Sequence, residues 1–350
     1  MARILAGTAS ALDTAVEDWR AGRQPAELLF GYNHLEAAGH DVSAVRFDWA
    51  ADGAKRGWEA ALDRATRGRL GNPRYGAAVL AQARGADLVY HSHLDTVSGL
   101  ALARRARLLR KPLVVIADPL YSVSRLNNIG VLGVSRLISV TRAGRDRVLA
   151  EVKLPHDDPV VLPWGPDLDF AGYRPATSPG EGIISTGRTM RSHASLLEAA
   201  GALGAPTRIS CLAPELAAQA PPNVGVVSAV RPFTEVMDDM RAAAVVAIPI
   251  AANPWGAVGL TELNAAMALA KPVVMHPNPY IDVDVEAIGM GFVVGDDPAQ
   301  WHRALSELLT DPEGAAERGA AGRRYAERHW NNALFGQGVV EVVDSVLERA

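Results

Sequence analysis

The sequence predicts an α/β protein with two doubly wound domains, and three observations support this prediction. Short apolar runs alternate along the chain with segments of helical periodicity, as in βαβ units that form parallel sheets. A length of 350 residues, of which 49% are hydrophobic, is enough for two domains that each bury a core. Breaker residues cluster over residues 163–180 and divide the pattern into two series, which is typical of a linker.

The domain boundaries follow from this division. We expect an N-terminal Rossmann-like domain over residues 1–170 and a C-terminal one over residues 171–335. A last helix over residues 336–350 is expected to pack back on the first domain. Because ligands of open α/β folds bind at the carboxyl ends of the strands, the two parallel sheets are expected to face a cleft between the domains.

The first series predicts six strands, which are Arg3–Ala6, Asp41–Phe47, Asp87–His91, Leu113–Ala117, Leu137–Val140 and Val160–Leu162. The helices expected between them are Ala26–Ala38, Gly76–Arg84, Val97–Leu109 and Arg142–Glu151. Residues 50–75 contain many Arg and Gly residues and have weak periodicity, so we expect a mobile excursion there.

The second series predicts six more strands, which are Gly182–Ser185, Thr207–Leu212, Val224–Val227, Ala243–Ile248, Pro272–Met275 and Phe292–Val294. The helices expected with them are Ser195–Ala202, Thr234–Arg241, Thr261–Ala270, Ala299–Leu309 and Ala315–Trp330. Together the two series predict two parallel sheets of similar size.

Composition narrows the class of protein. A formal net charge of −4 argues against a nucleic-acid-binding protein. The single cysteine, Cys211, excludes a disulfide within the chain and is expected in a buried strand. No signal peptide or membrane-spanning run is recognised, so we expect a cytoplasmic protein. The basic run Arg104–Lys111 predicts either a solvated helix face or peripheral contact with anionic lipid.

Residues 253–275 are the most informative stretch. A loop with Gly256 and Gly259 leads into an Ala-rich helix that is expected to begin near Thr261, and Lys271-Pro272 ends the helix before a buried strand. The N-terminus of a helix presents unpaired N–H groups and a partial positive charge, and this combination binds phosphate. The stretch therefore predicts a phosphate site.

Several segments in order resemble the retaining glycosyltransferases of the GT-B fold, specifically the large family 4 group. The similar segments are Val160–Phe170, Ile183–Arg191, Gly259–Val274, Asn278–Glu286, Gly291–Val294 and Tyr325–Trp330. The resemblance covers nearly the whole chain and is strongest in residues 160–330. It implies two Rossmann-like domains, a nucleotide-diphosphate sugar as donor and hexosyltransferase activity. The Ala- and Arg-rich composition fits a genome of high GC content, and we expect a bacterial protein.

The resemblance has one clear departure. Family members usually carry two glutamates eight positions apart around the donor helix, and these positions are Ala257 and Ala265 here. Glu262 lies three residues before Ala265 and shares its helical face, and Asn264 is adjacent, so either could bind a ribose or sugar hydroxyl. How the chain recognises its donor is therefore open at this point.

For the donor, the resemblance implies that Arg188 and Arg191 stabilise the leaving diphosphate as catalytic residues. The expected nucleotide-sugar-binding residues are Gly187, Gly256, Val258, Gly259, Leu260, Thr261 and Glu262. The alternatives are that the arginines are solvated loop cations, that Thr261 merely caps the helix, and that Glu262 only complements the helix dipole.

Further residues are weaker candidates. Asp118 occupies the position of a histidine of the catalytic region in many family members and would hold a hydroxyl, unless it only begins the turn before Pro119. The remaining substrate-binding candidates are His91, His93, Tyr121, Asp282 and Asp284. His91 and His93 alternate along the chain and therefore point to opposite faces, and a lone histidine is more often structural.

The resulting hypothesis is a retaining glycosyltransferase that moves a sugar from a UDP-sugar to a hydroxyl of a small-molecule, glycan or lipid acceptor. It needs no metal and no cofactor apart from the nucleotide sugar as co-substrate, because no metal-ligand spacing is present. Two alternatives remain, which are a sugar-nucleotide epimerase or pseudo-glycosyltransferase of the same fold and a non-catalytic nucleotide-sugar-binding subunit. A dinucleotide dehydrogenase is disfavoured because the first strand lacks the Gly-x-Gly-x-x-Gly fingerprint.

Overall fold

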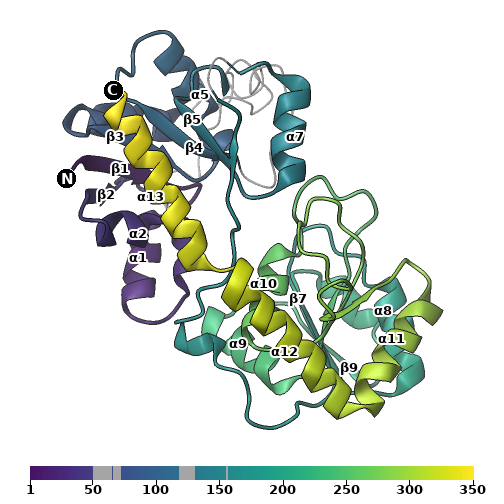
Figure 1. The fold of residues 1–350 in the computed structure, drawn as a ribbon. Helices are drawn as coiled ribbons and strands as arrows, with labels where there is room; N and C mark the ends of the chain where they lie inside the picture. The colour runs from purple at the N-terminus through teal and green to yellow at the C-terminus, as the bar shows by residue number, and fades with distance from the viewer. Residues whose placement is uncertain (50–64, 66–71, 118–130, 155–156) are drawn as a thin grey trace. The chain divides into compact units, whose positions relative to one another are not determined.

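The computed structural model describes residues 1–49, 65, 72–117, 131–154 and 157–350. The chain divides into two compact units, which are coloured along the sequence in Figure 1. Unit 1 consists of Met1–Arg20, Ala26–Trp164 and Ala333–Ala350, and unit 2 consists of Ala21–Pro25 and Gly165–Asn332. The excursion expected over residues 50–75 falls mostly outside the described residues.

Unit 1 is built on a parallel sheet with the strand order β2-β1-β3-β4-β5-β6. Its strands are β1 (Arg3–Gly7), β2 (Asp41–Ala44), β3 (Leu88–His91), β4 (Leu113–Ala117), β5 (Arg136–Ser139) and β6 (Val160–Val161). The three central strands β3, β4 and β5 are almost entirely buried, which explains why they are continuous apolar runs in the sequence.

The α-helices described in unit 1 are α1 (Leu12–Arg20), α2 (Tyr32–Ala37), α4 (Pro73–Gln82), α5 (Leu94–Arg105), α7 (Arg142–Glu151) and α13 (Asn332–Glu348). Two short 3₁₀ helices accompany them, η1 (Ala26–Leu29) and η3 (Ala83–Gly85). The helix α1 was not predicted from the sequence.

The single helix expected over Ala26–Ala38 is wrong. The segment breaks between η1 and α2, where Phe30 has a φ of 50° and Gly31 has a φ of 90°. Tertiary contacts hold the break in place: the Phe30 ring stacks on Trp164, and the Phe30 carbonyl accepts a hydrogen bond from the Tyr90 hydroxyl at 2.5 Å. Helical propensity alone could not indicate these contacts.

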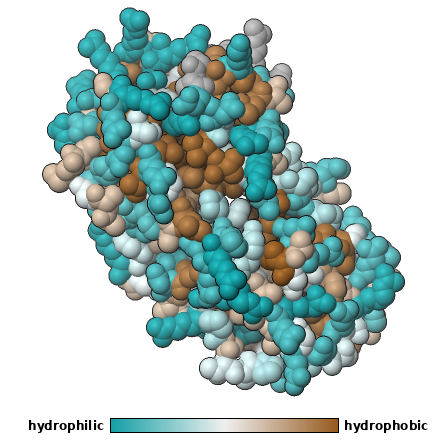
Figure 2. Space-filling model, in the orientation of Figure 1, coloured by the Kyte–Doolittle hydropathy of each residue, from teal (hydrophilic) through white to brown (hydrophobic). Residues whose placement is uncertain are grey.

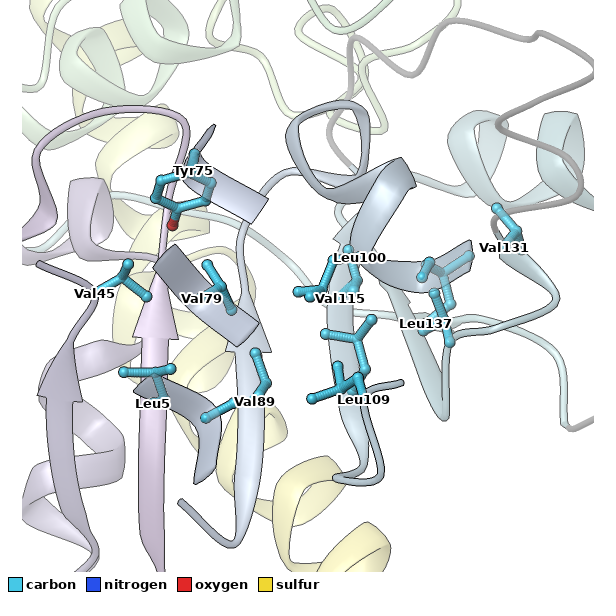
Figure 3. Close-up of a cluster of buried hydrophobic side chains, with 14 of the residues drawn as sticks. Leu5, Val45, Tyr75, Val79, Val89, Leu100, Leu109, Val115, Val131 and Leu137 are labelled. Atoms are coloured by element: carbon cyan, nitrogen blue, oxygen red, sulfur yellow. The ribbon is translucent and has the colours of Figure 1, made fainter. Parts of the chain in front are cut away.

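The core of unit 1 lies between the sheet and the helices that cover it. Figure 3 shows side chains of the strands, such as Leu5 and Val115, among side chains of helices α4 and α5, such as Val79 and Leu100. Each of these four is at most 3% exposed. Burial of this apolar surface fixes the strands, and with them the position of the loops at their carboxyl ends.

The basic run Arg104–Lys111 does not form one helical face, since α5 ends at Arg105 and Arg107 has a φ of 62°. Arg104 turns inward, where its guanidinium donates to the carbonyls of Lys111 at 3.0 Å and Gly133 at 2.8 Å. Burial accordingly lowers the pKa of Arg104. This arginine therefore joins the loop before β4 to the loop before β5.

The C-terminal helix α13 belongs to unit 1 and runs along it in yellow in Figure 1. Its buried residues Phe335, Val339 and Val343 are spaced by four and form one face of the helix. A Cβ atom at Gly31 would lie 3.1 Å from Val339, so glycine at that position permits the close approach of α13.

Unit 2 is built on a second parallel sheet with the order β12-β11-β10-β7-β8-β9. Its strands are β7 (Ile183–Thr186), β8 (Thr207–Ser210), β9 (Val224–Val227), β10 (Val245–Ile248), β11 (Val273–Met275) and β12 (Gly291–Val293). Chain order reverses between β7 and β10, which is the Rossmann arrangement. Open α/β sheets bind ligands beyond the carboxyl ends of the strands at such a point.

The helices of unit 2 are α8 (Ala194–Leu203), α9 (Phe233–Ala242), α10 (Leu260–Ala268), α11 (Pro298–Thr310) and α12 (Pro312–His329), with the 3₁₀ helices η4 (Ala171–Tyr173) and η5 (Pro214–Ala218). Trp301 of α11, which is wholly buried, lies in the main apolar core. Cys211 is a buried free thiol, as expected, but it follows β8 rather than lying in it.

The surface shown in Figure 2 is hydrophilic over most of unit 2, whereas apolar residues gather in the middle of unit 1. Among the described helices, none has the length and apolarity needed to cross a bilayer.

Candidate functional site

The loops that follow β7 and β10 meet at the point where chain order reverses in unit 2. The N–H of Ala251 donates to the carbonyl of Met190 at 2.8 Å, and the N–H of Ser192 donates to the carbonyl of Pro249 at 3.1 Å. Arg191 and Ile250 form an antiparallel bridge. Main-chain hydrogen bonds thus join the loops at the carboxyl ends of β7 and β10.

An ion pair joins these loops to helix α10. The Arg191 Nη2 lies 2.6 Å from the Glu262 Oε1, and the two side chains are only 5% and 12% exposed. Arg191 also donates to the carbonyls of Thr186 at 3.3 Å and Thr189 at 2.5 Å. Because Arg191 is paired with a buried carboxylate and bonded to two carbonyls, it holds the loop after β7 to α10 and is not a free cation.

Gly187 lies directly against this ion pair. It has a φ of 98°, and a Cβ atom there would come within 2.0 Å of the Glu262 Oε1 and 2.3 Å of the Arg191 Nη2. Glycine is therefore required at the end of β7 for steric as well as conformational reasons.

Substitution of Gly187 by Ala should destabilise unit 2 strongly, because the added methyl group must displace the ion pair. The matched control is Gly204→Ala, which also has a positive φ of 63° but has no atom within 4 Å of the added Cβ. We expect the control to lose about 1–2 kcal/mol from backbone strain alone, and Gly187→Ala to lose at least about 1 kcal/mol more from overpacking. Urea unfolding measures both losses, and equal losses would contradict the steric argument.

The N-terminus of α10 supplies main-chain donors. Gly259 caps the helix with a φ of 92° and provides no side-chain cap. In the part of the chain that the structure describes, the N–H groups of Thr261 and Glu262 have no hydrogen-bond partner. Thr261 is exposed in the first turn of the helix and does not cap it. These N–H groups and the helix dipole favour an anion.

Asn278, which sequence reasoning did not place in the site, holds the loop before α10. Its side-chain amide donates to the carbonyls of Gly256 and Val258, each at 2.9 Å, and its Oδ1 accepts from the N–H of Tyr280. Asn278 thereby fixes the peptides of Gly256 and Val258. Its place just after β11, at the carboxyl edge of the sheet, was a signal that could have identified it.

Arg188 differs from Arg191 in being exposed. No hydrogen bond or ion pair joins its guanidinium to another residue within the described ranges. It follows Gly187 at the end of β7, the strand next to β10, after which α10 begins. A free guanidinium in that place can take a phosphate with two parallel hydrogen bonds.

His276 and Trp301 form a buried pair behind these loops that sequence reasoning missed. The His276 Nδ1 lies 2.6 Å from the Ile250 carbonyl and must donate to it, so the His276 Nε2 accepts from the Trp301 Nε1 at 3.0 Å. The same Nε2 also lies 3.3 Å from the Asp296 carboxylate. His276 ties the end of β11 to the loop that pairs with Arg191.

His193 is a further polar side chain near Arg191. It is 8% exposed, and its Nε2 has no partner among the described residues. Burial, and secondarily the charge of Arg191, lowers the pKa of His193 to about 4. The histidine is accordingly neutral at pH 7.

The acidic residues after β11 are partly used in a turn. The Asp284 Oδ1 accepts from the N–H of Ala287 at 3.0 Å, and the Glu286 Oε1 accepts from the N–H of Val293 at 3.2 Å. Asp282 is half-buried. Among the described interactions, no hydrogen bond or ion pair joins Asp282 or Asp284 to Arg188 or Glu262. Their expected role in donor binding stays a prediction.

In unit 1, the chain order reverses between β1 and β3, and His91 lies at this point. His91 is wholly buried; its Nδ1 accepts from the N–H of His93 at 3.1 Å, and its Nε2 lies 3.0 Å from the Tyr75 hydroxyl. His93 is half-buried, with its Nδ1 2.6 Å from the Ser92 hydroxyl and its ring edge-on to Phe30. Of the two, only His93 has access to solvent. Asp118 and Tyr121 lie outside the described residues.

Stability should depend on pH through the two buried histidines. Burial, with a smaller effect of His93, lowers the pKa of His91 to about 3, and His193 is lowered to about 4. Since the unfolded chain binds these protons near pH 6.5, the stabilisation is complete above that pH and is lost as the pH falls towards 4. Between pH 6 and 4.5 the free energy of unfolding should fall more steeply with decreasing pH in the wild-type protein than in His91→Gln. The difference in slope should be about 1.4 kcal/mol per pH unit. Urea titrations at each pH test this, and parallel curves would contradict it.

Within the described ranges, no three His, Cys, Asp or Glu residues are grouped so that they could hold a metal ion. The candidate site therefore consists of the unpaired α10 amides, Arg188, and the supporting residues Arg191, Glu262 and Asn278.

Comparison with protein-family models finds no match. A curated relative, D-inositol 3-phosphate glycosyltransferase from Thermobispora bispora, is 29% identical over 152 residues, which are 42% of this chain and 35% of the relative. The matched part thus spans about a third of the relative's length.

Solved structures match almost the whole chain. HepE from Anabaena in complex with UDP superposes with a TM-score of 0.67 at 16% identity, covering 98% of this chain and all of the other. WaaG, a glycosyltransferase of lipopolysaccharide biosynthesis, has a TM-score of 0.62 at 12% identity and covers 97% of this chain and 99% of its own. A putative UDP-N-acetylglucosamine 2-epimerase from Listeria monocytogenes has a TM-score of 0.60 at 13% identity and covers 99% and 97%. With its two six-stranded parallel sheets in Rossmann-like units, this chain has the GT-B fold.

Proposed function

We propose that this chain is a glycosyltransferase that takes a sugar from a nucleotide-diphosphate sugar and transfers it to a hydroxyl acceptor. The observation that carries the proposal is that two amides at the N-terminus of α10 and the guanidinium of Arg188, which follows the neighbouring strand β7, have no partners among the described residues. The curated relative is named a glycosyltransferase, and HepE binds UDP and UDP-glucose, which supports the same activity here with a UDP-sugar as donor.

The donors of the candidate site match the chemistry of a diphosphate. The α10 amides and dipole would bind one phosphate, and the Arg188 guanidinium would bind the developing charge on the leaving oxygen. The α10 amides are preorganised by the helix, so they stabilise charge in the transition state without having to reorient, whereas the exposed Arg188 side chain would take up its position when the diphosphate binds. In this scheme they supply the electrostatic stabilisation that a metal ion supplies elsewhere, and we propose a metal-independent reaction.

The proposed reaction is a front-face displacement with retention at the anomeric carbon. The acceptor oxygen forms a bond to the anomeric carbon while the bond from that carbon to the β-phosphate oxygen breaks. The acceptor proton passes to the departing phosphate oxygen, so the products are the glycoside and the nucleoside diphosphate. In this reaction no side chain needs to act as a base.

The two positions at which family members usually carry glutamates are buried in this structure. Ala257 is 5% exposed and Ala265 is 1% exposed, so a carboxylate at either position would have to be buried in this packing. Glu262, the nearby carboxylate, is held by Arg191. We therefore propose that Glu262 orients the arginine and the loop after β7, and that sugar selection depends on other groups.

Unit 1 is the proposed acceptor-binding part. Where chain order reverses between β1 and β3, His93 is partly exposed to solvent. His91 is buried and contacts the Tyr75 hydroxyl. His93 is thus the better candidate of the two for contact with an acceptor hydroxyl.

A sugar-nucleotide epimerase is the second candidate, and the structural match to a putative UDP-N-acetylglucosamine 2-epimerase favours it over a non-catalytic binding subunit. An epimerase converts UDP-N-acetylglucosamine to an epimer without an acceptor, whereas a glycosyltransferase releases UDP only when sugar is transferred or hydrolysed. Chromatography of the reaction mixture separates the two. A non-catalytic subunit would bind the nucleotide sugar and give neither product.

The experiment that tests the proposal is calorimetric titration with UDP, GDP and their glucose conjugates, in buffer with EDTA. We expect micromolar-range binding of a uridine diphosphate that does not require a divalent ion, with release of UDP once an acceptor is added. Binding of no nucleotide diphosphate would refute the proposal, since the α10 amides and Arg188 would then have no anion to hold.

A further inference from the structure

A cavity lies in unit 2, away from the candidate donor site. It has a volume of about 580 Å³, and several of its lining residues immediately precede strands of the sheet: Gly182 before β7, Pro206 before β8, Ala244 before β10 and Pro272 before β11. Because the strands are parallel, these residues mark the amino edge of the sheet. The candidate donor site lies at the carboxyl edge, so the two sites are separate.

The walls of this cavity, hereafter the amino-edge cavity, are largely apolar. Residues of the linker before β7, the last turn of α11 and the first turn of α12 line it, including Pro175, Pro179, Leu308 and Pro312. Apolar walls with a few polar groups are the usual construction of a small-molecule site, and a volume of several hundred cubic ångströms is typical of one.

Lys271 supplies the polar group that the cavity would use. The residue lines the cavity and is 6% exposed, and its Nζ donates to the carbonyl of Ala243 at 2.7 Å. The ammonium has three N–H donors, and this carbonyl is the one acceptor that the structure describes for them. No described carboxylate lies at ion-pair distance from the ammonium. Burial, with the nearby Arg241, lowers the pKa of Lys271.

The surroundings of Lys271 offer no internal counter-ion among the described residues. Arg241 is itself bonded to the carbonyls of Gly172 and Arg174 and to the carboxylate of Asp238. Glu181 lines the cavity but is exposed, and it is not among the groups that influence Lys271. Buried charges in proteins are normally paired, and a ligand carboxylate in the cavity would give the Lys271 ammonium the counter-ion that the described residues do not supply.

We propose that the amino-edge cavity binds a small carboxylate with an apolar body, and that the Lys271 ammonium pairs with its carboxylate. The apolar part would occupy the space between the linker and the ends of α11 and α12. Neither the proposed glycosyl transfer nor the resemblance of the chain to glycosyltransferases requires such a site.

The test uses octanoate as the probe and octanamide as its neutral analogue, with binding followed by calorimetry and thermal shift. Wild-type protein should bind octanoate and gain melting temperature from it, and it should bind octanamide at least about 10-fold more weakly, since a charge-assisted hydrogen bond is lost. Lys271→Met should weaken octanoate binding by about 10-fold or more and leave octanamide binding nearly unchanged. Failure of octanoate to bind the wild-type protein, or equal affinity for both probes, would overturn the proposal.

Two further variants make the result specific. Ala316→Trp places a bulky side chain at an exposed lining position of α12 and should block both probes without disturbing the core. Lys153→Met removes an exposed lysine of unit 1 and should bind octanoate as the wild type does. UDP binding should be unchanged in all three variants, which separates failure of this proposal from failure of the proposed function. Octanoate binding that survives both Lys271→Met and Ala316→Trp would place the ligand elsewhere and refute the assignment.

Discussion

Replacing Arg188 by Ala is expected to lower the turnover of sugar transfer by about 100-fold or more. Arg188 is exposed at the end of β7, has no described partner, and follows the glycine that packs on the Arg191–Glu262 pair. Its charge is therefore free to stabilise the leaving diphosphate, and nothing in the described fold depends on it. Release of UDP from UDP-glucose in the presence of an acceptor measures the effect.

The control for this prediction is Arg324→Ala, which removes an exposed arginine from α12 in the same unit. Both variants should keep the wild-type free energy of unfolding, because neither guanidinium is buried. Arg188→Lys should recover only part of the activity, since an ammonium cannot form the two parallel hydrogen bonds of a guanidinium. If Arg188→Ala turned over sugar as fast as Arg324→Ala, Arg188 would have no part in the reaction.

Breaking the Arg191–Glu262 ion pair on one side is expected to give the largest loss of stability. In Glu262→Met the Arg191 guanidinium, with 5% of the side chain exposed, would stay buried without its carboxylate. Removal of one partner of a buried pair costs about 3–5 kcal/mol, whereas removal of both costs less because no lone charge remains. The double variant Arg191→Met with Glu262→Met should therefore be more stable than Glu262→Met by at least about 1 kcal/mol.

A surface ion pair in the same unit supplies the comparison. Glu327 pairs with Arg323 on α12 but is about half exposed, and Arg323 keeps a second bond to the carbonyl of Ala268. Glu327→Met should lose no more than about 1 kcal/mol. Urea unfolding of the wild type and of these variants measures the differences. If the double variant were no more stable than Glu262→Met, the unpaired Arg191 charge would not be the cause of the loss of stability.

Much of the fold was predictable because the strands are short apolar runs with clear boundaries. The helix expected at Arg142–Glu151 coincides with α7, and the predicted strands Gly182–Ser185 and Val224–Val227 correspond to β7 and β9. Prediction failed where tertiary contacts override local propensity, as at Phe30 and Gly31, where stacking on Trp164 splits an expected helix.

The sequence predicted where the candidate site lies, but not the separate roles of its residues. The resemblance to GT-B glycosyltransferases assigned Arg188, Arg191 and the loop before α10 to the same diphosphate. It treated the two arginines alike, although only the structure shows that Arg191 is committed to Glu262. Asn278, His276 and Trp301 went unassigned because their roles depend on contacts with residues about 20 or more positions away in the chain.

The order of apolar runs and helical segments was sufficient to determine that this chain forms two parallel α/β units, because periodicity and breaker residues act locally. Which cations remain free was decided by the tertiary structure alone. Arg188, Arg191 and Lys271 differ in burial and in partners, and these are set by elements far apart in sequence that the folded sheet brings together.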